Sequence, residues 1–100
     1  MGFKIVFTKP ATADLDGLVT FISRDNPRAA EQLGYEIIAK AEKLEEFPLL
    51  GRVVPEFKIE NIREIIRRPY RIVYRVREDR KLIEILRVWH AARGTPGIYE

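Results

Sequence analysis

The stretch of sequence that decides the fold is residues 70–77, Tyr-Arg-Ile-Val-Tyr-Arg-Val-Arg. Tyr70, Ile72, Tyr74 and Val76 share one parity, and Arg71, Val73, Arg75 and Arg77 share the other. Alternation with a period of two is typical of a β-strand that is buried on one face. We therefore predict a strand whose first set of side chains faces a core and whose arginine-bearing set lines the open face of a sheet.

Two further strands are predicted on either side of this one, at residues 61–68 and 81–90. In the earlier strand, Arg63, Ile65 and Arg67 alternate with Ile62, Glu64 and Ile66. In the later one, Leu82, Leu86, Val88 and His90 share one parity, and Ile83, Ile85, Arg87 and Trp89 share the other. Arg68-Pro69 and residues 78–80 supply the turns. Short turns between consecutive strands indicate an antiparallel meander.

The first half of the chain predicts a strand and two helices. Residues 3–8 are rich in β-forming types. Apolar residues at helical spacing indicate a helix over about 10–24, with Pro10 in its first turn. A second helix starts after Asn26, whose side chain can cap it, with Pro27 at the first helical position. It ends at Phe47-Pro48, and residues 48–58 read as a loop.

The predicted fold class is α+β, in the order β-α-α-β-β-β. A helical hairpin packs on one face of a mainly antiparallel four-stranded sheet. We expect residues 1–100 to form one domain, with a mobile tail over 93–100.

Composition excludes several classes of function. The chain of 100 residues contains no cysteine and one histidine, so we expect no metal site and no cofactor. No nucleotide-binding glycine motif occurs, and the single serine lacks the context of a hydrolase nucleophile. No apolar run is long enough to span a membrane, so we expect a cytoplasmic protein.

Charge is unevenly distributed along the chain. Residues 1–50 carry 6 basic and 8 acidic side chains, whereas residues 51–100 carry 12 and 7, and ten of these twelve are arginines. Arginine forks suit phosphates and carboxylates, so this half predicts a nucleic-acid or acidic protein partner. A solvated sheet face with interspersed salt bridges is the alternative interpretation.

An ordered set of motifs runs through residues 3–93. It comprises Asp14-Leu15, Asn26-Pro27, Pro48-Leu49-Leu50-Gly51-Arg52, Ile62-Arg63-Glu64, Tyr70 to Val76, and His90-Ala91-Ala92-Arg93. This combination resembles the ParE/RelE toxin superfamily, and its ParE branch more closely. The resemblance implies the toxin of a type II toxin–antitoxin (plasmid stabilisation) system, neutralised by a cognate antitoxin with which it could form a hetero-oligomer. ParE-type members inhibit DNA gyrase without doing chemistry, and RelE-type members cut messenger RNA on the ribosome.

The resemblance also implies candidate residues. If the chain is RelE-like, Arg71 matches the arginine used on the scissile phosphate, Arg63 lies near a basic catalytic position, and His90 lies near an acid/base histidine. However, Ala91 stands where a second catalytic arginine is expected, and Tyr99 lies two residues beyond the expected terminal tyrosine. Ile62 and Glu64 occupy positions where lysines are expected. These departures favour the ParE-like function over the nuclease, which we keep as an alternative beside an inactive antitoxin-binding member.

Several of these residues also have structural interpretations. The structural interpretation of Arg71 is a salt bridge to Glu64 or Glu84 across the sheet. That of His90 is a structural or exposed position at the end of a strand. Arg52, Arg75, Arg93 and Trp89 are predicted to bind a partner. Alternatively, Arg52 and Arg93 anchor the loop and the tail, and Trp89 packs partly buried.

Overall fold

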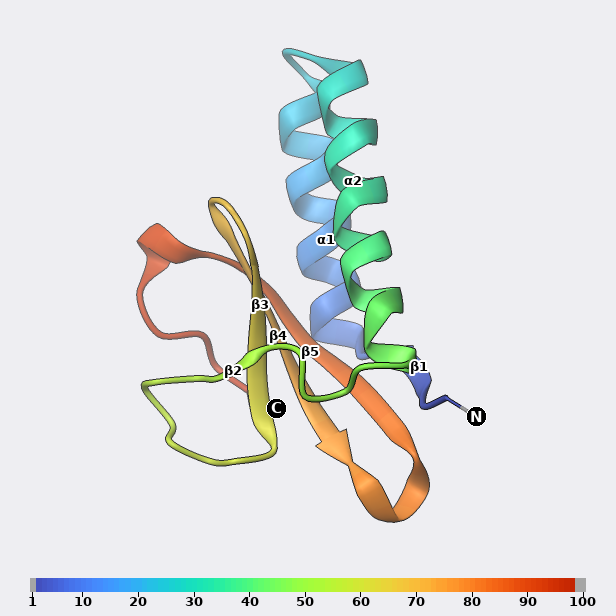
Figure 1. The fold of residues 1–100 in the computed structure, drawn as a ribbon. Coiled ribbons are helices and arrows are strands. Elements are labelled where there is room, and N and C mark those ends of the chain that lie inside the picture. The colour runs from blue at the N-terminus through green and yellow to red at the C-terminus, as the bar shows by residue number, and fades with distance from the viewer. Residues whose placement is uncertain (1, 99–100) are drawn as a thin grey trace.

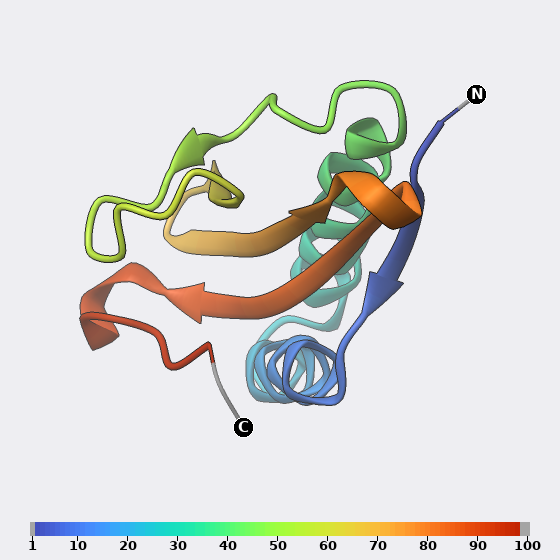
Figure 2. The ribbon, with the colours of Figure 1, turned by 90° about the horizontal axis from the view of Figure 1, so that it is seen from below.

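A computed structural model describes residues 2–98. Two helices pack against one face of a twisted sheet (Figures 1 and 2). The elements are β1 (Lys4–Phe7), α1 (Lys9–Ser23), α2 (Pro27–Glu42), β2 (Arg52–Val53), β3 (Ile62–Arg67), β4 (Tyr70–Arg77) and β5 (Leu82–His90), with short 3-10 helices at Lys43–Glu45, Glu78–Arg80 and Ala91–Arg93. None of the described helices is both long and apolar enough to cross a bilayer.

The sheet has the strand order β1-β5-β4-β3-β2. The meander of β3, β4 and β5 is antiparallel as predicted, and β1 joins it parallel to β5. The predicted α+β class is confirmed, with one correction: the sheet has five strands because Arg52 and Val53, predicted to be loop, pair with β3. The side chain of Arg52 bonds that of Glu64 directly opposite, and Pro55 follows closely to end the strand.

Helix α2 begins where its predicted cap places it, and α1 begins at Lys9, next to the predicted start near residue 10. Asn26 accepts a hydrogen bond from the Ala29 N–H at 3.1 Å and caps α2, with Pro27 at the first position. Thr8 caps α1 by accepting from the Ala11 N–H, and its hydroxyl also reaches the Ile85 carbonyl at 3.0 Å. The first cap therefore also ties α1 to β5. Helix α2 ends at Glu42, earlier than predicted, because the chain tightens into a 3-10 turn in which Leu44 is buried.

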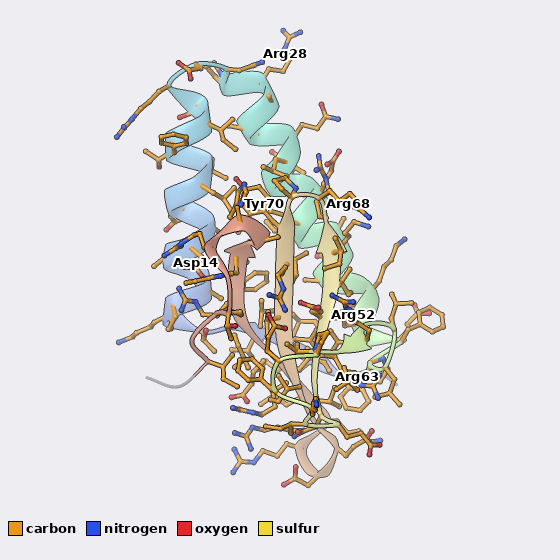
Figure 3. The ribbon with its side chains drawn as sticks, turned by 90° about the vertical axis from the view of Figure 1, so that its left-hand side faces the viewer. Asp14, Arg28, Arg52, Arg63, Arg68 and Tyr70 are labelled. Atoms are coloured by element: carbon orange, nitrogen blue, oxygen red, sulfur yellow. The ribbon has the colours of Figure 1, made fainter. Side chains whose placement is uncertain are left out.

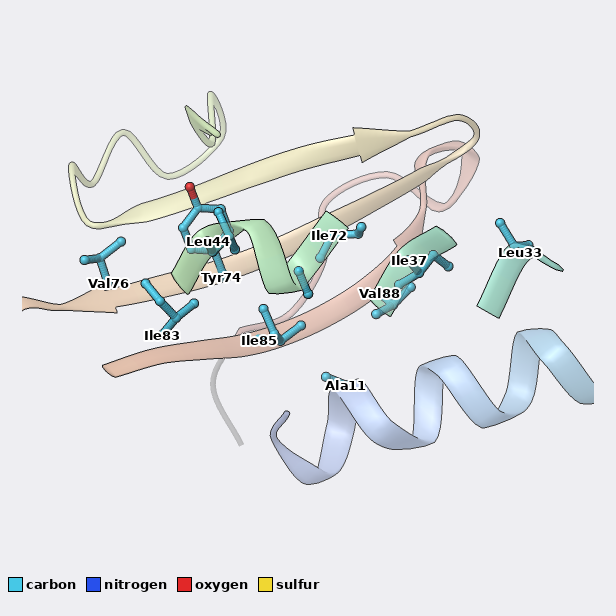
Figure 4. Close-up of a cluster of buried hydrophobic side chains, with 11 residues drawn as sticks. Ala11, Leu33, Ile37, Leu44, Ile72, Tyr74, Val76, Ile83, Ile85 and Val88 are labelled. Carbon is cyan, nitrogen blue, oxygen red and sulfur yellow. The ribbon is translucent and has the colours of Figure 1, made fainter. Parts of the chain in front are cut away.

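The main core lies between the helices and the sheet (Figure 4). Its fully buried members are Ala11, Ile37, Ala41, Leu44, Ile72, Tyr74, Ile83 and Ile85. The predicted inner parity of β4 is therefore confirmed. A second, smaller cluster on the other face comprises Val54, Ile62, Val73, Leu86 and Ile98.

The predicted alternation along β5 fails at Leu86. A β-bulge leaves Leu86 without a partner, because Val73 pairs with Arg87 while Tyr74 pairs with Ile85. One extra residue in a strand moves every later side chain to the opposite face of the sheet from the one that the alternation predicts. Ile83, Ile85 and Val88 thus share the helix side, although the sequence alternation separates Val88 from the other two.

The C-terminal segment differs from the predicted mobile tail as far as the structure describes it. Pro96 and Ile98 are buried, and Arg87 donates to the Gly97 carbonyl at 3.0 Å. Residues 94–98 therefore lie against the sheet, because Ile98 completes the second apolar cluster.

Gly51 is the position where a side chain has no room. A Cβ built there meets the Glu64 carbonyl oxygen at 2.4 Å and the Tyr74 hydroxyl at 2.8 Å. That hydroxyl accepts from the Gly51 N–H and donates to the Pro48 carbonyl, both at 2.9 Å, so it fixes the loop before β2. Tyr74 is thus a core tyrosine with a satisfied hydroxyl, as its place in the alternation predicts.

We predict opposite effects of alanine at two glycines. Gly51→Ala lowers the free energy of unfolding by about 1–3 kcal/mol, since backbone must shift to admit the methyl group. Gly17→Ala, inside α1 with open space around it, raises that free energy by about 0.5–1 kcal/mol. Urea denaturation measures both values, and a Gly51→Ala protein as stable as the parent would contradict the assigned close contact.

Candidate functional site

Glu64 lies at the centre of the sheet face that carries the arginines of β4, which we call the arginine face. Its side chain has no exposed surface. One carboxylate oxygen accepts from Arg52 Nε and Nη2, each at 2.8 Å, and the other accepts from Arg71 Nε at 2.7 Å. A buried charge is tolerated only when it is paired and hydrogen-bonded. Glu64 meets both conditions through its two arginine neighbours.

Arg71 is bound by a second carboxylate, that of Glu56 in the loop between β2 and β3. Arg71 Nη1 lies 2.6 Å and Nη2 2.7 Å from the two Glu56 oxygens, the bidentate geometry that makes arginine–carboxylate pairs strong. Arg71 as a whole is only 8% exposed. Hydrogen bonding to Glu56 and Glu64 raises the pKa of Arg71, and the same contact with Arg71 lowers the pKa of Glu56. Of the two salt bridges given as structural alternatives for Arg71, the one to Glu64 is present.

These four residues, Arg52, Glu56, Glu64 and Arg71, form what we call the Glu64 network. Two carboxylates balance two guanidinium groups, so the network has no net charge at neutral pH. A cleft of about 460 Å³ lies beside it, lined also by Ile66, Arg68 and Ala91. Of the network's arginines, Arg52, labelled in Figure 3, has the more exposed side chain, at 61%.

Arg63 lies on the other face of the sheet from Arg71. It shares the parity of Ile65, which packs against the main core, and of Arg67, which pairs with Glu36 of α2. Its guanidinium donates to the Gly51 carbonyl at 3.0 Å and to the Glu60 carbonyl at 3.1 Å. Arg63 therefore braces the loops on either side of β2.

His90 also faces the helix side. It pairs across the sheet with Tyr70, and the two rings meet edge to face with centroids 5.3 Å apart. Its Nδ1 accepts from the Ala92 N–H at 3.1 Å, which leaves Nε2 to carry the ring proton. The structure therefore does not bring the three candidate nuclease residues together, since the sheet separates Arg71 from Arg63 and His90.

The remaining sheet arginines are also paired with carboxylates. Glu84 accepts from Arg75 at 3.2 Å and from Arg77 at 2.7 Å. Burial alone would raise the pKa of Glu84, but these two hydrogen bonds bring it below its ordinary value. The arginine face is thus much less positive than its sequence suggests, because acidic partners come from other strands and loops.

Asp14 of α1 is a structural residue that the sequence places only near the start of a helix. Its carboxylate accepts from Arg87 Nε at 2.7 Å and Nη2 at 2.8 Å, and from the Val88 N–H at 3.0 Å. The hydrogen bonds from Asp14 raise the pKa of Arg87. Asp14 thereby accepts a hydrogen bond from a backbone N–H of β5 that lies beyond the end of β1 and so has no partner in that strand. No pattern of periodicity could reveal this pair, because its members are 73 positions apart.

Trp89 and Arg93 form a stack at the end of β5. Trp89 is 8% exposed. The guanidinium carbons of Arg87 and Arg93 lie 4.4 and 3.9 Å from the centroid of its ring. Its indole N–H donates to the Gly94 carbonyl at 3.1 Å. Trp89 is therefore packed, as the structural alternative for it expects, and its predicted binding to a partner stays a prediction. Arg93 is the exposed member of the stack. Tyr99 lies outside the described residues.

Comparison with known proteins fits this architecture. The model of the ParE toxin of the type II toxin–antitoxin system parDE matches residues 5–94. The chain belongs to the ParE toxin family. As a ParE/RelE family protein, it is a type II toxin–antitoxin toxin.

The chain is similar to one curated toxin and to chains of solved toxin–antitoxin systems. Toxin RelE2 of Caulobacter vibrioides is 33% identical over 91 residues, covering 90% of this chain and 97% of that protein. The chromosomal ParDE system of P. aeruginosa contains a chain with a TM-score of 0.72 and 24% identity, over 88% of this toxin and 95% of that chain. A chain of the RelBE2 toxin–antitoxin complex from Mycobacterium tuberculosis has a TM-score of 0.64 and 25% identity, over 90% and 99% respectively.

We predict that the toxin's acid stability depends on Glu56. Arg71 holds the pKa of the folded Glu56 carboxyl below its ordinary 4.5, so the pair stabilises the fold above that pH and the contribution is lost as pH falls through the folded value. Glu56→Gln should therefore be less stable than the parent at pH 7, with the difference shrinking below pH about 4.5. Chemical denaturation across pH measures this. Glu60→Gln, in the same loop, is the control, and a difference independent of pH would contradict the pairing.

Proposed function

We propose that this toxin acts by binding a protein target, DNA gyrase, and does not itself cut messenger RNA. The observation that carries the proposal is the separation of Arg71 from Arg63 and His90 by the sheet. RNA cleavage needs a base, an acid and cations around a single phosphate. Groups on opposite faces of one sheet cannot contact the same phosphate, whereas a binding function has no such requirement.

The state of Arg71 supports the same proposal. An RNA phosphate would have to displace Glu56 and compete with Glu64 for a guanidinium that already makes three short hydrogen bonds to carboxylates. Arg71 is therefore better suited to holding β3, β4 and the Glu56 loop together than to binding substrate.

We further propose that a cognate antitoxin neutralises the toxin by covering the helical hairpin or the arginine face. A groove of about 520 Å³ between α1 and α2 supports the first location. It is lined by Val19, Gly34 and Ile38 among others, and Tyr35 beside them is 67% exposed. An amphipathic segment that folds as it binds would bury these side chains.

A paired assay tests the proposal. With purified toxin at micromolar concentration, we expect inhibition of DNA gyrase supercoiling or gyrase-dependent DNA cleavage, relieved by the product of the adjoining antitoxin gene. In ribosomal translation reactions read by primer extension, we expect no codon-specific cuts. His90→Asn, which leaves the Glu64 network intact, should behave as the parent in both assays. Codon-specific cuts that disappear with His90→Asn would instead establish the nuclease alternative.

A further inference from the structure

A cleft between α1 and the ends of β4 and β5 is separate from the Glu64 network. It has a volume of about 470 Å³, and we call it the Gly17 cleft. Asp14 and Tyr70, both labelled in Figure 3, come from its two sides. Its apolar lining includes Leu18, Phe21, Tyr70 and Val88.

Gly17 keeps this cleft open. It lies in the interior of α1, where glycine costs a helix stability, and a Cβ built on it meets nothing within 4 Å. No neighbouring atom therefore comes so close to residue 17 that only glycine would fit there. One turn further along the helix, Phe21 is 69% exposed. The residues together leave an apolar hollow with an aromatic rim that the described chain does not fill.

The backbone edge of β5 borders the same cleft. Strand β1 ends at Phe7, opposite Ile85, whereas β5 continues to His90. The Val88 N–H points away from β4, toward Asp14, and hydrogen-bonding directions alternate along a strand. The His90 N–H and the Val88 carbonyl therefore also point away from β4, spaced to pair with one residue of an extended chain that continues the line of β1.

The polar groups at the cleft favour an acidic ligand. The Asp14 carboxylate is already bound by Arg87. His90 presents an N–H at Nε2, because its Nδ1 accepts from Ala92. Arg93 stacks on Trp89 and forms no ion pair with any residue between 2 and 98. The cleft thus offers a cation and a neutral donor, with no uncompensated carboxylate among its lining residues.

We propose that the Gly17 cleft is a docking site for an extended acidic segment of a partner protein. One large apolar side chain of that segment lies against Gly17, its backbone pairs with the edge of β5 at residues 88–90, and a carboxylate lies beside Arg93. Backbone pairing supplies affinity in strand addition, and the side-chain pocket supplies selectivity. This inference does not rest on gyrase being the target, since peptide binding to the cleft can be measured without gyrase.

Peptide titration followed by amide NMR tests the proposal. The probes are capped hexapeptides with a central Leu, Phe or Trp flanked by glutamates, added to millimolar concentration. We expect at least one to give saturable shifts at the amides of Gly17, Val88 and His90. Replacing the central residue by serine should abolish the shifts, and replacing the glutamates by lysines should weaken binding by about fivefold or more.

Two variants with matched controls separate the cleft from the rest of the surface. Gly17→Leu fills the cleft and improves helix propensity, so it should fold at least as stably as the parent and bind about tenfold more weakly or worse. Thr12→Leu, exposed elsewhere on α1, should bind as the parent does. Arg93→Gln should weaken binding of the acidic peptide, and Arg28→Gln, at the tip of the hairpin, should not.

Several outcomes would overturn the inference. One is that none of the three acidic peptides shifts the cleft amides. Another is that binding survives Gly17→Leu unchanged. The third is that the same amides shift with protein concentration alone, which would assign the cleft to contact between two copies of the toxin.

Discussion

The structure depends on one buried carboxylate, that of Glu64. A charge with no exposed surface must be neutralised where it lies, and Arg52 and Arg71 do this from β2 and β4. Arg71 in turn binds Glu56, which fixes the loop that covers this part of the sheet. The pairing explains why a two-residue strand forms in a loop containing two prolines. It also explains why Gly51 must lie so close to the Glu64 backbone, since β2 has to approach near enough for Arg52 to reach the carboxylate.

The same interaction changes what the arginine-rich half of the chain can do. Its arginines suggest a surface prepared for phosphate, yet those of β4 and β5 are bound to Glu56, Glu64, Glu84 and Asp14. Charges compensated within the fold contribute rigidity more than affinity for an anion. The surfaces that remain available to a partner are the edge of the arginine face, the groove between α1 and α2, and the Gly17 cleft. A toxin built in this way is suited to binding proteins, and its family resemblance to nucleases does not by itself give it their chemistry.

The features that depend on local sequence pattern were predicted correctly. The features that depend on contacts between residues far apart in the chain were not. The caps at Asn26 and Pro27, the two helices and the inner parity of β4 follow from spacing and residue type. The bulge at Leu86 could not be read from the sequence, because Val-Trp and Ile-Leu pairs are apolar on either parity. Arg71 was expected on an open sheet face, with a salt bridge to Glu64 or Glu84 as the structural alternative. The structure buries it and forms the bridge to Glu64. Glu56 and Asp14 were missed as partners because nothing local marks a carboxylate that reaches across 15 or 73 positions.

The most direct test of the central claim is to observe the Arg71 guanidinium itself. In ¹⁵N-labelled toxin, the arginine Nε–H signals can be followed by NMR while a short single-stranded RNA is added, and Arg71→Lys identifies the Arg71 signal by its loss. If Arg71 is held by Glu64 and Glu56, its Nε–H should exchange slowly with water and should not shift, while signals of exposed arginines such as Arg28 broaden or move. A saturable shift of the Arg71 signal with RNA, together with faster exchange, would show that the guanidinium is free to bind phosphate and would contradict the account.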